Sequence, residues 1–205
     1  MPRVAYSKAE REKIKNLLVE VGLELFLQQG IRHTTVEQIY KRVGISRTFF
    51  YTFFSTKEDL ILEALYLQQP KILETARNLA QDKSLSWRKA LTRLLYTCCY
   101  GGKSGIAVLS IEEQQLVFKR MTSAGYKQFR ERQSDLFKNI LEIFGIRAND
   151  EQTALVINLS LSIIIVRQAI PETLPLFVTE SADAAVDFHI KALVDFLEQL
   201  RGQAE

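Results

Sequence analysis

The sequence is poor in cysteine and histidine. Its two cysteines, Cys98 and Cys99, are neighbours, so a disulfide between them would strain the backbone and close no useful loop. We therefore expect reduced thiols and exclude a secreted disulfide scaffold. His33 and His189 are too few for a metal site, and the cysteines have no CxxC spacing. The sequence predicts no metal, no cofactor and no catalytic constellation, so we do not expect an enzyme.

Long apolar runs are also absent. The most apolar stretch, residues 154–166, is interrupted by an asparagine and two serines. It is well short of the roughly 20 apolar residues that a membrane-spanning helix needs. The basic N-terminal segment lacks the apolar core of a signal peptide. We therefore expect a cytoplasmic protein with no membrane partner and no cleaved leader.

Proline and glycine are scarce, with four and nine residues in a chain of 205. No stretch of strand length alternates between apolar and polar residues, whereas apolar residues recur at helical spacing. The expected fold class is therefore all-α. A first helix should end at Gly30, and three short helices should follow before residue 69. The later helices are expected over residues 70–81, 85–100, 112–120, 123–144, 150–169 and 182–200.

The excess of positive charge lies in the first third of the chain. Residues 1–59 carry ten basic and seven acidic side chains, whereas residues 60–205 carry seventeen of each. A basic part beside a neutral part is a weak indication of nucleic-acid binding. We expect two domains, with short helices in residues 1–59 and longer helices in residues 60–205.

Three helix starts follow one another before residue 60. Thr34 and Glu37 have the spacing of a capping box, and Ser55 and Glu58 repeat that spacing. Ser46 is suited to cap the helix between them. The sequence therefore predicts a helix N-terminus at each of these three places.

A turn that contains Gly44 joins two of these short helices. The pair has the dimensions of a helix-turn-helix, although such pairs are common in any all-α protein. Ile45, Phe50 and Phe54 can point inward, which leaves a polar side exposed. Arginine and hydroxyl side chains are what base edges and phosphates accept in a major groove. The exposed residues expected on the second helix are Ser46, Arg47, Thr48, Tyr51 and Thr52.

Two runs of the N-terminal part form a specific pattern. They are F-x-x-x-G-I-R-H-T-T-V-E-Q-I and G-I-S-R-T-F-F-Y-T-F-F-S-T-K-E-D-L. The pattern resembles the N-terminal domain of the TetR family of bacterial transcriptional regulators, over about 50 residues. The matching positions are Phe26, Gly30, Thr34, Thr35, Ile39, Gly44, Ile45, Ser46, Tyr51, Phe54, Lys57, Glu58 and Leu60.

The resemblance implies a role in DNA binding for individual residues. By position, Thr35 and Lys57 would contact phosphates, and Lys57 stands in the first turn of a helix whose N-terminus also favours a phosphate. Arg47 is expected to read a base directly, as a bidentate contact to guanine. The other residues expected at the groove are Ser46, Thr48 and Thr52, with Tyr51 packed against the backbone or a base.

Three positions depart from the family pattern. Thr48 stands where the family usually has glycine, Phe49 where it has threonine or alanine, and Tyr40 where it has alanine. Phe49 cannot donate a hydrogen bond to a phosphate, so it either contacts a thymine methyl group or packs within the domain. These departures affect base recognition rather than the fold.

The resemblance also implies that residues 60–205 form a ligand-binding and dimerisation domain. Two apolar stripes are candidates for an interface around a twofold axis. The alternative is that both stripes are buried within one chain. The stripe residues are Leu155, Leu159, Ser162 and Val166 in the helix over 150–169, and Val186, His189, Leu193, Phe196 and Leu197 in the helix over 182–200.

A set of aromatic residues with one arginine is the candidate ligand pocket. An aromatic cavity with one cation suits an apolar or weakly acidic small molecule, although the same residues would also make an ordinary core. The candidates are Trp87, Tyr96, Tyr100, Phe118, Tyr126, Phe129, Phe137 and Arg167.

Together these features predict a homodimeric, ligand-responsive repressor. It would bind a (pseudo)palindromic operator in double-stranded DNA and respond to an unidentified small-molecule effector. The alternative is a helical interaction protein or small-molecule-binding protein that does not bind DNA.

Overall fold

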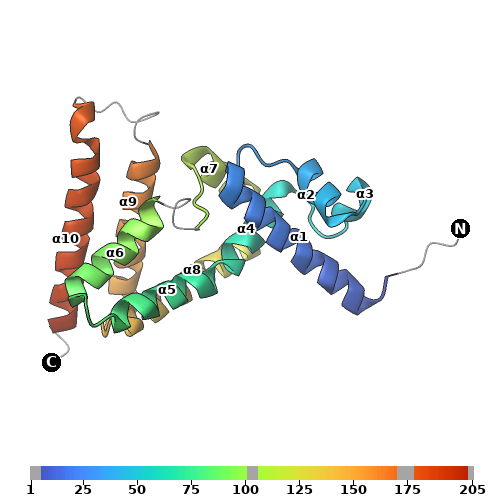
Figure 1. Cartoon of the computed structure of the whole chain (residues 1–205). Coiled ribbons are helices and arrows are strands. Elements are labelled where there is room, and N and C mark those ends of the chain that lie inside the picture. Colours follow the sequence, from blue (N-terminus) through green and yellow to red (C-terminus); the bar gives the residue numbers. More distant parts are fainter. Residues whose placement is uncertain (1–5, 101–105, 170–177, 203–205) are drawn as a thin grey trace, which may run out of the picture. The chain divides into compact units, whose positions relative to one another are not determined.

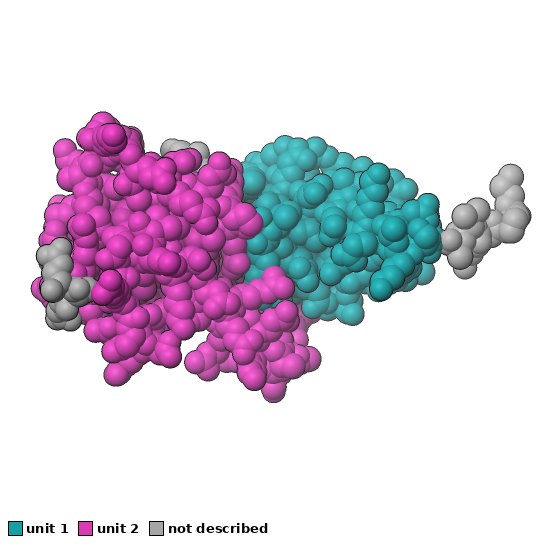
Figure 2. Space-filling model, turned by 90° about the horizontal axis from the view of Figure 1, so that it is seen from below, with its two compact units in different colours: residues 1–68 teal, residues 69–205 magenta. Residues whose placement is uncertain are grey.

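The computed structural model describes residues 6–100, 106–169 and 178–202. The chain divides into two compact units, residues 1–68 and 69–205, which are coloured separately in Figure 2. Every regular element in the described ranges is a helix, in agreement with the expected all-α fold class. No helix in these ranges has the length and apolar character needed to cross a membrane.

Within the described residues, unit 1 contains four helices and unit 2 contains six, with a short 3-10 turn before the last one (Figure 1). The helices of unit 1 are α1 (Lys8–Gln29), α2 (Val36–Val43), α3 (Arg47–Phe50) and α4 (Lys57–Leu67). Those of unit 2 are α5 (Gln69–Gln81), α6 (Trp87–Tyr100), α7 (Ile111–Arg120), α8 (Ser123–Ile143), α9 (Asp150–Ala169) and α10 (Ala182–Gly202), preceded by η2 (Thr179–Ser181).

The core of unit 1 lies between α1 and the three short helices. Leu18, Ile39, Phe50 and Leu60, one from each helix, are fully buried. Gly22 allows α1 and α4 to approach closely, because a Cβ atom at this position would lie 2.6 Å from Leu60 Cδ2. Helices α2 and α4 pack against α1, and α3 packs against α2, so each short helix is held by its buried side chains and by a neighbouring helix.

The helix starts of unit 1 are shifted by one residue from two of the predicted capping boxes. Thr35, not Thr34, is the N-cap of α2 and forms its box with Gln38. Thr56 with Asp59, not Ser55 with Glu58, begins α4. Thr34 is instead buried, and its hydroxyl donates to the carbonyl oxygen of Gly30 at 2.8 Å. Ser46 caps α3 as predicted.

Unit 2 is built around α6, α9 and α10, with α5 and α8 packed against one side of this group. The core of unit 2 includes one fully or nearly fully buried residue from each of these three helices, namely Leu94, Val156 and Ile190. The indole of Trp87 donates to the carbonyl oxygen of Phe144 at 2.8 Å and so fixes α6 to the end of α8. The guanidinium of Arg88 forms ion pairs with two carboxylates of α10.

The two cysteines lie in the last turn of α6. Both are free thiols, and Cys99 is buried in the core of unit 2. Burial raises the pKa of the Cys98 thiol to about 11 and that of Cys99 to about 12. Because a thiolate is the reactive form, neither thiol has the character of a nucleophile.

The expected domain boundary between residues 59 and 60 falls inside α4. The structure instead divides after Gln68, because α4 packs along α1 and contributes Leu60 and Ala64 to the core of unit 1.

Candidate nucleic-acid interface

Helices α2 and α3 are joined by a tight turn. Gly44 has φ 80° and ψ 28°, a left-handed conformation that glycine adopts without steric cost. Its N–H bonds to the carbonyl oxygens of Tyr40 and Lys41, which closes α2. The Oγ of Ser46 then accepts the N–H of Phe49 at 3.2 Å and begins α3. These local bonds produce the helix-turn-helix that the sequence predicted.

Helix α3 separates its apolar and polar side chains as expected. Phe50 is fully buried and Phe54 is nearly so, whereas the side chain of Tyr51 is 43% exposed. The structure brings the remaining predicted groove residues to the exposed side together with Tyr51; they are Ser46, Arg47, Thr48 and Thr52. Arginine and hydroxyl groups therefore share one accessible surface.

Arg47 lies near both an aromatic ring and a carboxylate. Its guanidinium carbon is 5.9 Å from the ring centroid of Tyr51. Glu37 is hydrogen-bonded to Lys41 at 2.6 Å, which lowers the pKa of the Glu37 carboxyl and raises that of the Lys41 ammonium. Arg47 adds a smaller electrostatic contribution that also lowers the pKa of Glu37. Lys41 thus compensates most of the negative charge of the Glu37 carboxylate. The side chain of Arg47 is exposed on α3.

Phe49 packs within unit 1, which was one of the two alternatives for this residue. Its ring stacks on Tyr6, with centroids 4.9 Å apart, and meets Phe53 edge-on at 5.0 Å. Arg11 of α1 lies over both phenylalanine rings, and its Nη2 donates to Thr52 Oγ1 at 3.3 Å. Sequence reasoning missed this arrangement, because no spacing rule connects Arg11 with residues some forty positions later.

The two predicted phosphate-binding residues both make bonds within the fold. The hydroxyl of Thr35 accepts the N–H of Gln38 at 3.2 Å and lies on an exposed surface. Nζ of Lys57, at the first position of α4, donates to the carbonyl oxygen of Ile31 at 2.6 Å. The lysine thus joins the start of α4 to the loop before α2. An ammonium has three donors, so this bond does not conflict with a phosphate contact.

The residues predicted to line a ligand pocket differ in the contacts they make within unit 2. Trp87 and Phe137 pack against the core. Tyr96, Tyr100 and Arg167 form a polar cluster between α6, α9 and α10. The third group, on α7 and α8, consists of Phe118, Tyr126 and Phe129, whose rings form edge-to-face pairs with centroids 5.6 Å and 6.3 Å apart. Trp87, Tyr96, Tyr100 and Phe137 all pack against the same core cluster of unit 2, and a single aromatic cavity stays a prediction.

Carboxylates of α10 bind the two tyrosines of the polar cluster, whereas the buried Nε of Arg167 makes no hydrogen bond within the described residues and lies 3.9 Å from Oδ1 of Asp183. Tyr96 donates to Asp187, and Tyr100 donates to Asp183 at 3.3 Å. The guanidinium of Arg167 lies over the Tyr100 ring at 4.5 Å. The bond to Asp187, with burial, raises the pKa of Tyr96 to about 12. These contacts join three helices of unit 2.

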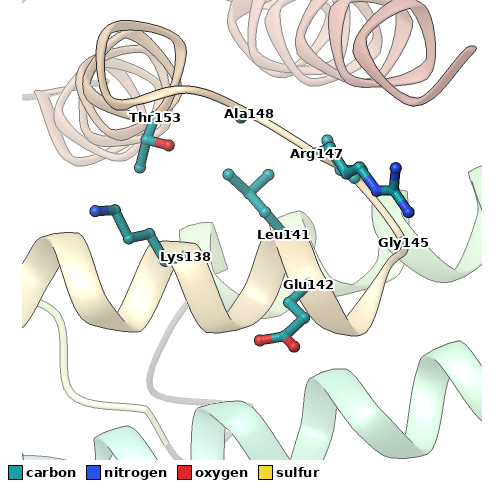
Figure 3. A pocket seen from close by; sticks show the side chains of 8 residues that line it. Lys138, Leu141, Glu142, Gly145, Arg147, Ala148 and Thr153 are labelled. Atoms are coloured by element: carbon teal, nitrogen blue, oxygen red, sulfur yellow. The ribbon is translucent and has the colours of Figure 1, made fainter. Parts of the chain in front are cut away.

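A hollow of about 440 Å³ lies elsewhere in unit 2, where α8 is followed by α9 (Figure 3). Figure 3 shows Lys138, Leu141 and Glu142 on α8 and Thr153 near the start of α9. Gly145, Ile146, Arg147 and Ala148 in the connecting segment complete the lining. None of the predicted pocket residues takes part in it.

The predicted dimer stripe of α10 is largely a core stripe. Val186, Leu193 and Leu197 are at most 3% exposed within the single chain, so they cannot also meet a second chain. The apolar stripe of α10 spans more than one side of the helix. The sequence pattern does not show which of these sides faces the core of unit 2. Of the other stripe residues, Val166 and Phe196 are half-buried, whereas Leu155, Leu159, Ser162 and His189 are exposed.

Phe188 is the exposed apolar residue of α10 that sequence reasoning missed. Its side chain is 69% exposed, more than Leu155 at 45% or Leu159 at 37% on α9. Among the described side chains of α9 and α10, the large apolar residues that are exposed are therefore Leu155, Leu159 and Phe188.

Comparison with known proteins identifies the family. Residues 18–64, which contain the helix-turn-helix, match the model of the bacterial regulatory proteins of the tetR family. The chain belongs to the TetR family. The HTH-type transcriptional regulator YuxN of Bacillus subtilis is 31% identical over 145 residues, which is 68% of this chain and 47% of YuxN. A probable acrEF/envCD operon repressor of Escherichia coli is 34% identical over 68 residues, which is 33% of this chain and 30% of that protein.

Structural similarity to the TetR family extends beyond the matched segment. The crystal structure of a TetR transcriptional regulator from Rhodococcus sp. RHA1 superposes with a TM-score of 0.58 at 14% identity, covering 90% of this chain and 97% of that one. This similarity shows that both units share the TetR fold. The chain spans about half the length of YuxN, and the family model ends at residue 64, within α4.

Proposed function

We propose that this TetR-family protein is a transcriptional regulator that binds a double-stranded DNA operator through α2 and α3. The observation that carries the proposal is the division of α3, which buries Phe50 and exposes Arg47 and Thr48. These exposed residues have the chemistry that a major groove accepts, on a helix that follows a glycine turn. The same residues lie inside the segment that matches the family.

In this proposal Arg47 reads a base and two other residues hold the backbone. A bidentate contact to guanine is the commonest specific contact of arginine with DNA. Thr35 and Lys57 bind phosphates, with Lys57 at the N-terminus of α4, where the helix dipole also favours an anion. The side chains of Ser46, Thr48, Tyr51 and Thr52 complete the surface that meets the groove.

We also propose that the protein acts as a homodimer, because two recognition helices are needed to read two half-sites of a palindrome. The exposed apolar residues Leu155, Leu159 and Phe188 support an interface made by α9 and α10. A contiguous patch of exposed apolar side chains marks an interaction surface, and these three residues are the candidates for such a patch. Val186, Leu193 and Leu197 have no part in this interface.

A repressor that a small-molecule effector releases from DNA is the form of regulation we propose. The E. coli relative named as a probable operon repressor supports repression, rather than activation, of transcription. The effector site is assigned to unit 2, and the proposal includes no catalytic step. A regulator of a bacterial operator acts in the cytoplasm, where the DNA is.

Selection of bound duplexes from a random library, with the full-length chain, tests this function. We expect enrichment of a (pseudo)palindrome whose half-sites are one helical turn, about 34–36 Å, or a multiple of it apart. Binding should weaken as the salt concentration rises, because phosphate contacts release counterions. Failure to enrich any sequence, with no salt-dependent affinity for DNA, would favour the helical interaction or small-molecule-binding protein instead.

A further inference from the structure

The recognition helix α3 is too short to hold its own direction. It spans only Arg47–Phe50, a single turn, and an isolated helix of this length is not stable in water. Its buried anchor is Phe50, which is fully enclosed in the core of unit 1. Phe54, which follows it, is also nearly buried and packs on Phe50, so these two side chains hold one side of the turn. A second point of attachment is needed to set where Arg47 and Thr48 point.

A cluster of side chains from α1 and the end of α3 supplies that second attachment. We call it the α1–α3 cluster; it consists of Tyr6, Arg11, Phe49, Thr52 and Phe53. The guanidinium carbon of Arg11 is 5.5 Å from the Phe49 ring centroid and 4.8 Å from that of Phe53. Tyr6 stacks on the Phe49 ring at an interplanar angle of 19°. The phenylalanine at position 49 is therefore covered by two side chains that precede or belong to the first turn of α1.

A hydrogen-bond chain connects the same arginine to the backbone of α3. Nη2 of Arg11 donates to Thr52 Oγ1 at 3.3 Å, and that hydroxyl donates to the carbonyl oxygen of Phe49 at 2.8 Å. Phe49 and Phe50 are consecutive, so their side chains leave the helix about 100° apart. Holding both of them fixes the rotation of α3 about its own axis.

The contacts of Arg11 depend on the flat shape of its head group. A guanidinium stacks on aromatic rings and donates in a rigid plane, whereas an ammonium is a compact and more strongly hydrated charge. Within residues 6–100, 106–169 and 178–202, Arg11 forms no ion pair, so rings and one hydroxyl are its partners. Lysine at this position would keep the positive charge but would lose the planar group that stacks on the rings.

We infer that Arg11 is a positioning residue of the DNA-binding surface, acting through Phe49 and Thr52 to set the direction of Arg47 and Thr48 and hence the choice of base. This inference rests on the proposed function. It differs from a phosphate contact, because its effect falls on sequence discrimination rather than on general affinity for DNA.

The test compares Arg11→Lys and Arg11→Ala with Lys13→Ala as a control. Lys13 is an exposed cation of the same helix, outside the α1–α3 cluster. The affinity of each full-length variant is measured for the selected operator and for operators with one base pair changed, at several salt concentrations. The ratio of these affinities is the discrimination, and the salt slope reports the phosphate contacts.

Arg11→Lys should lose about three- to tenfold in discrimination, from the loss of two cation–π contacts, while its salt slope stays that of the wild type. Arg11→Ala should show the same loss of discrimination, and Lys13→Ala should show none. In the double-mutant cycle with Phe49→Leu, the two substitutions should not be additive in discrimination, because both disconnect the same contact. Amide hydrogen exchange should also be faster at Tyr51 and Phe53 in Arg11→Lys without DNA.

Three results would overturn the inference. If Arg11→Lys discriminates as well as the wild type, the charge alone matters and Arg11 is a phosphate contact. If Arg11→Ala lowers the thermal stability of unit 1 and leaves discrimination unchanged, its role is structural only. If the wild type selects no DNA sequence, the proposed function itself fails, and the inference fails with it.

Discussion

Phe188 and Leu193 lie on the same helix, but replacing each by alanine should have different effects on the protein. Phe188 is 69% exposed in the single chain, whereas Leu193 is 3% exposed and belongs to the core of unit 2. Phe188→Ala should therefore dissociate the proposed dimer and leave the fold of each chain intact. Leu193→Ala should destabilise the fold.

The size of both effects follows from burial. A phenylalanine buries about 150–250 Å² when fully enclosed, and apolar surface contributes about 25 cal/mol per Å². Enclosing the part of Phe188 that is now exposed would contribute about 2–3 kcal/mol per subunit, allowing for the carbon that alanine keeps. With two copies in a dimer, loss of both should raise the dimer dissociation constant by about three to four orders of magnitude. Leu193→Ala should lower the free energy of unfolding by about 2–5 kcal/mol.

Sedimentation equilibrium of the full-length chain over a range of concentrations measures the dissociation constant, and circular dichroism measures helix content and thermal unfolding. Phe188→Ala should sediment as a monomer with unchanged helix content at concentrations where the wild type is dimeric. A Phe188→Ala chain with the dissociation constant of the wild type would refute the assignment of this surface. A Leu193→Ala chain that dissociated without losing stability would refute the placement of Leu193 in the core.

Three further outcomes can be measured. Arg47→Ala should weaken binding to the selected operator by about 1–3 kcal/mol and relax the preference at one base pair per half-site, whereas Arg77→Ala, which removes the same exposed side chain from α5, should do neither. Lys57→Ala should weaken binding to all sequences alike and reduce the salt slope by about one per half-site; a changed sequence preference would contradict the phosphate assignment. For Tyr96, the hydrogen bond to a carboxylate of α10 and burial raise the pKa of the phenol to about 12, so the stability it provides is complete below about pH 10 and is lost as the pH rises towards 12. The advantage of the wild type over Tyr96→Phe in urea unfolding should therefore shrink between about pH 10 and pH 12, and a constant difference would contradict it.

Helix positions were predictable from the sequence because apolar spacing, glycine turns and hydroxyl caps act locally. The capping boxes were misplaced by one residue only where two hydroxyl residues are adjacent, as at Thr34 and Thr35. Either residue can accept the first free N–H of a helix. The choice depends on burial of Thr34, whose hydroxyl bonds to Gly30, and a local pattern does not contain that information.

Contacts between distant parts of the chain were not predictable in the same way. The apolar residues of α10 cover a wide angle, so the sequence shows an apolar helix but not which residues, such as Leu193 or Phe188, face the core. The aromatic residues of unit 2 suit a pocket by composition, but the sequence does not show that Tyr96 and Tyr100 bond to carboxylates of α10. The contact between Arg11 and Phe49 depends on how α1 passes the end of α3, which only the folded chain determines.

The residues of the DNA-binding surface differ in how much the fold already requires of them. The hydroxyls of Thr35 and Ser46 accept the N–H groups that begin α2 and α3, and substitution of either typically costs about 1 kcal/mol of helix stability. Lys57 holds the carbonyl oxygen of Ile31. A loss of DNA binding after these substitutions therefore combines a lost contact with a disturbed fold. Arg47 and Thr48 do not cap a helix and lie exposed, so evolution or design can exchange them with little loss of stability. They are the positions at which a new operator sequence should be easiest to specify.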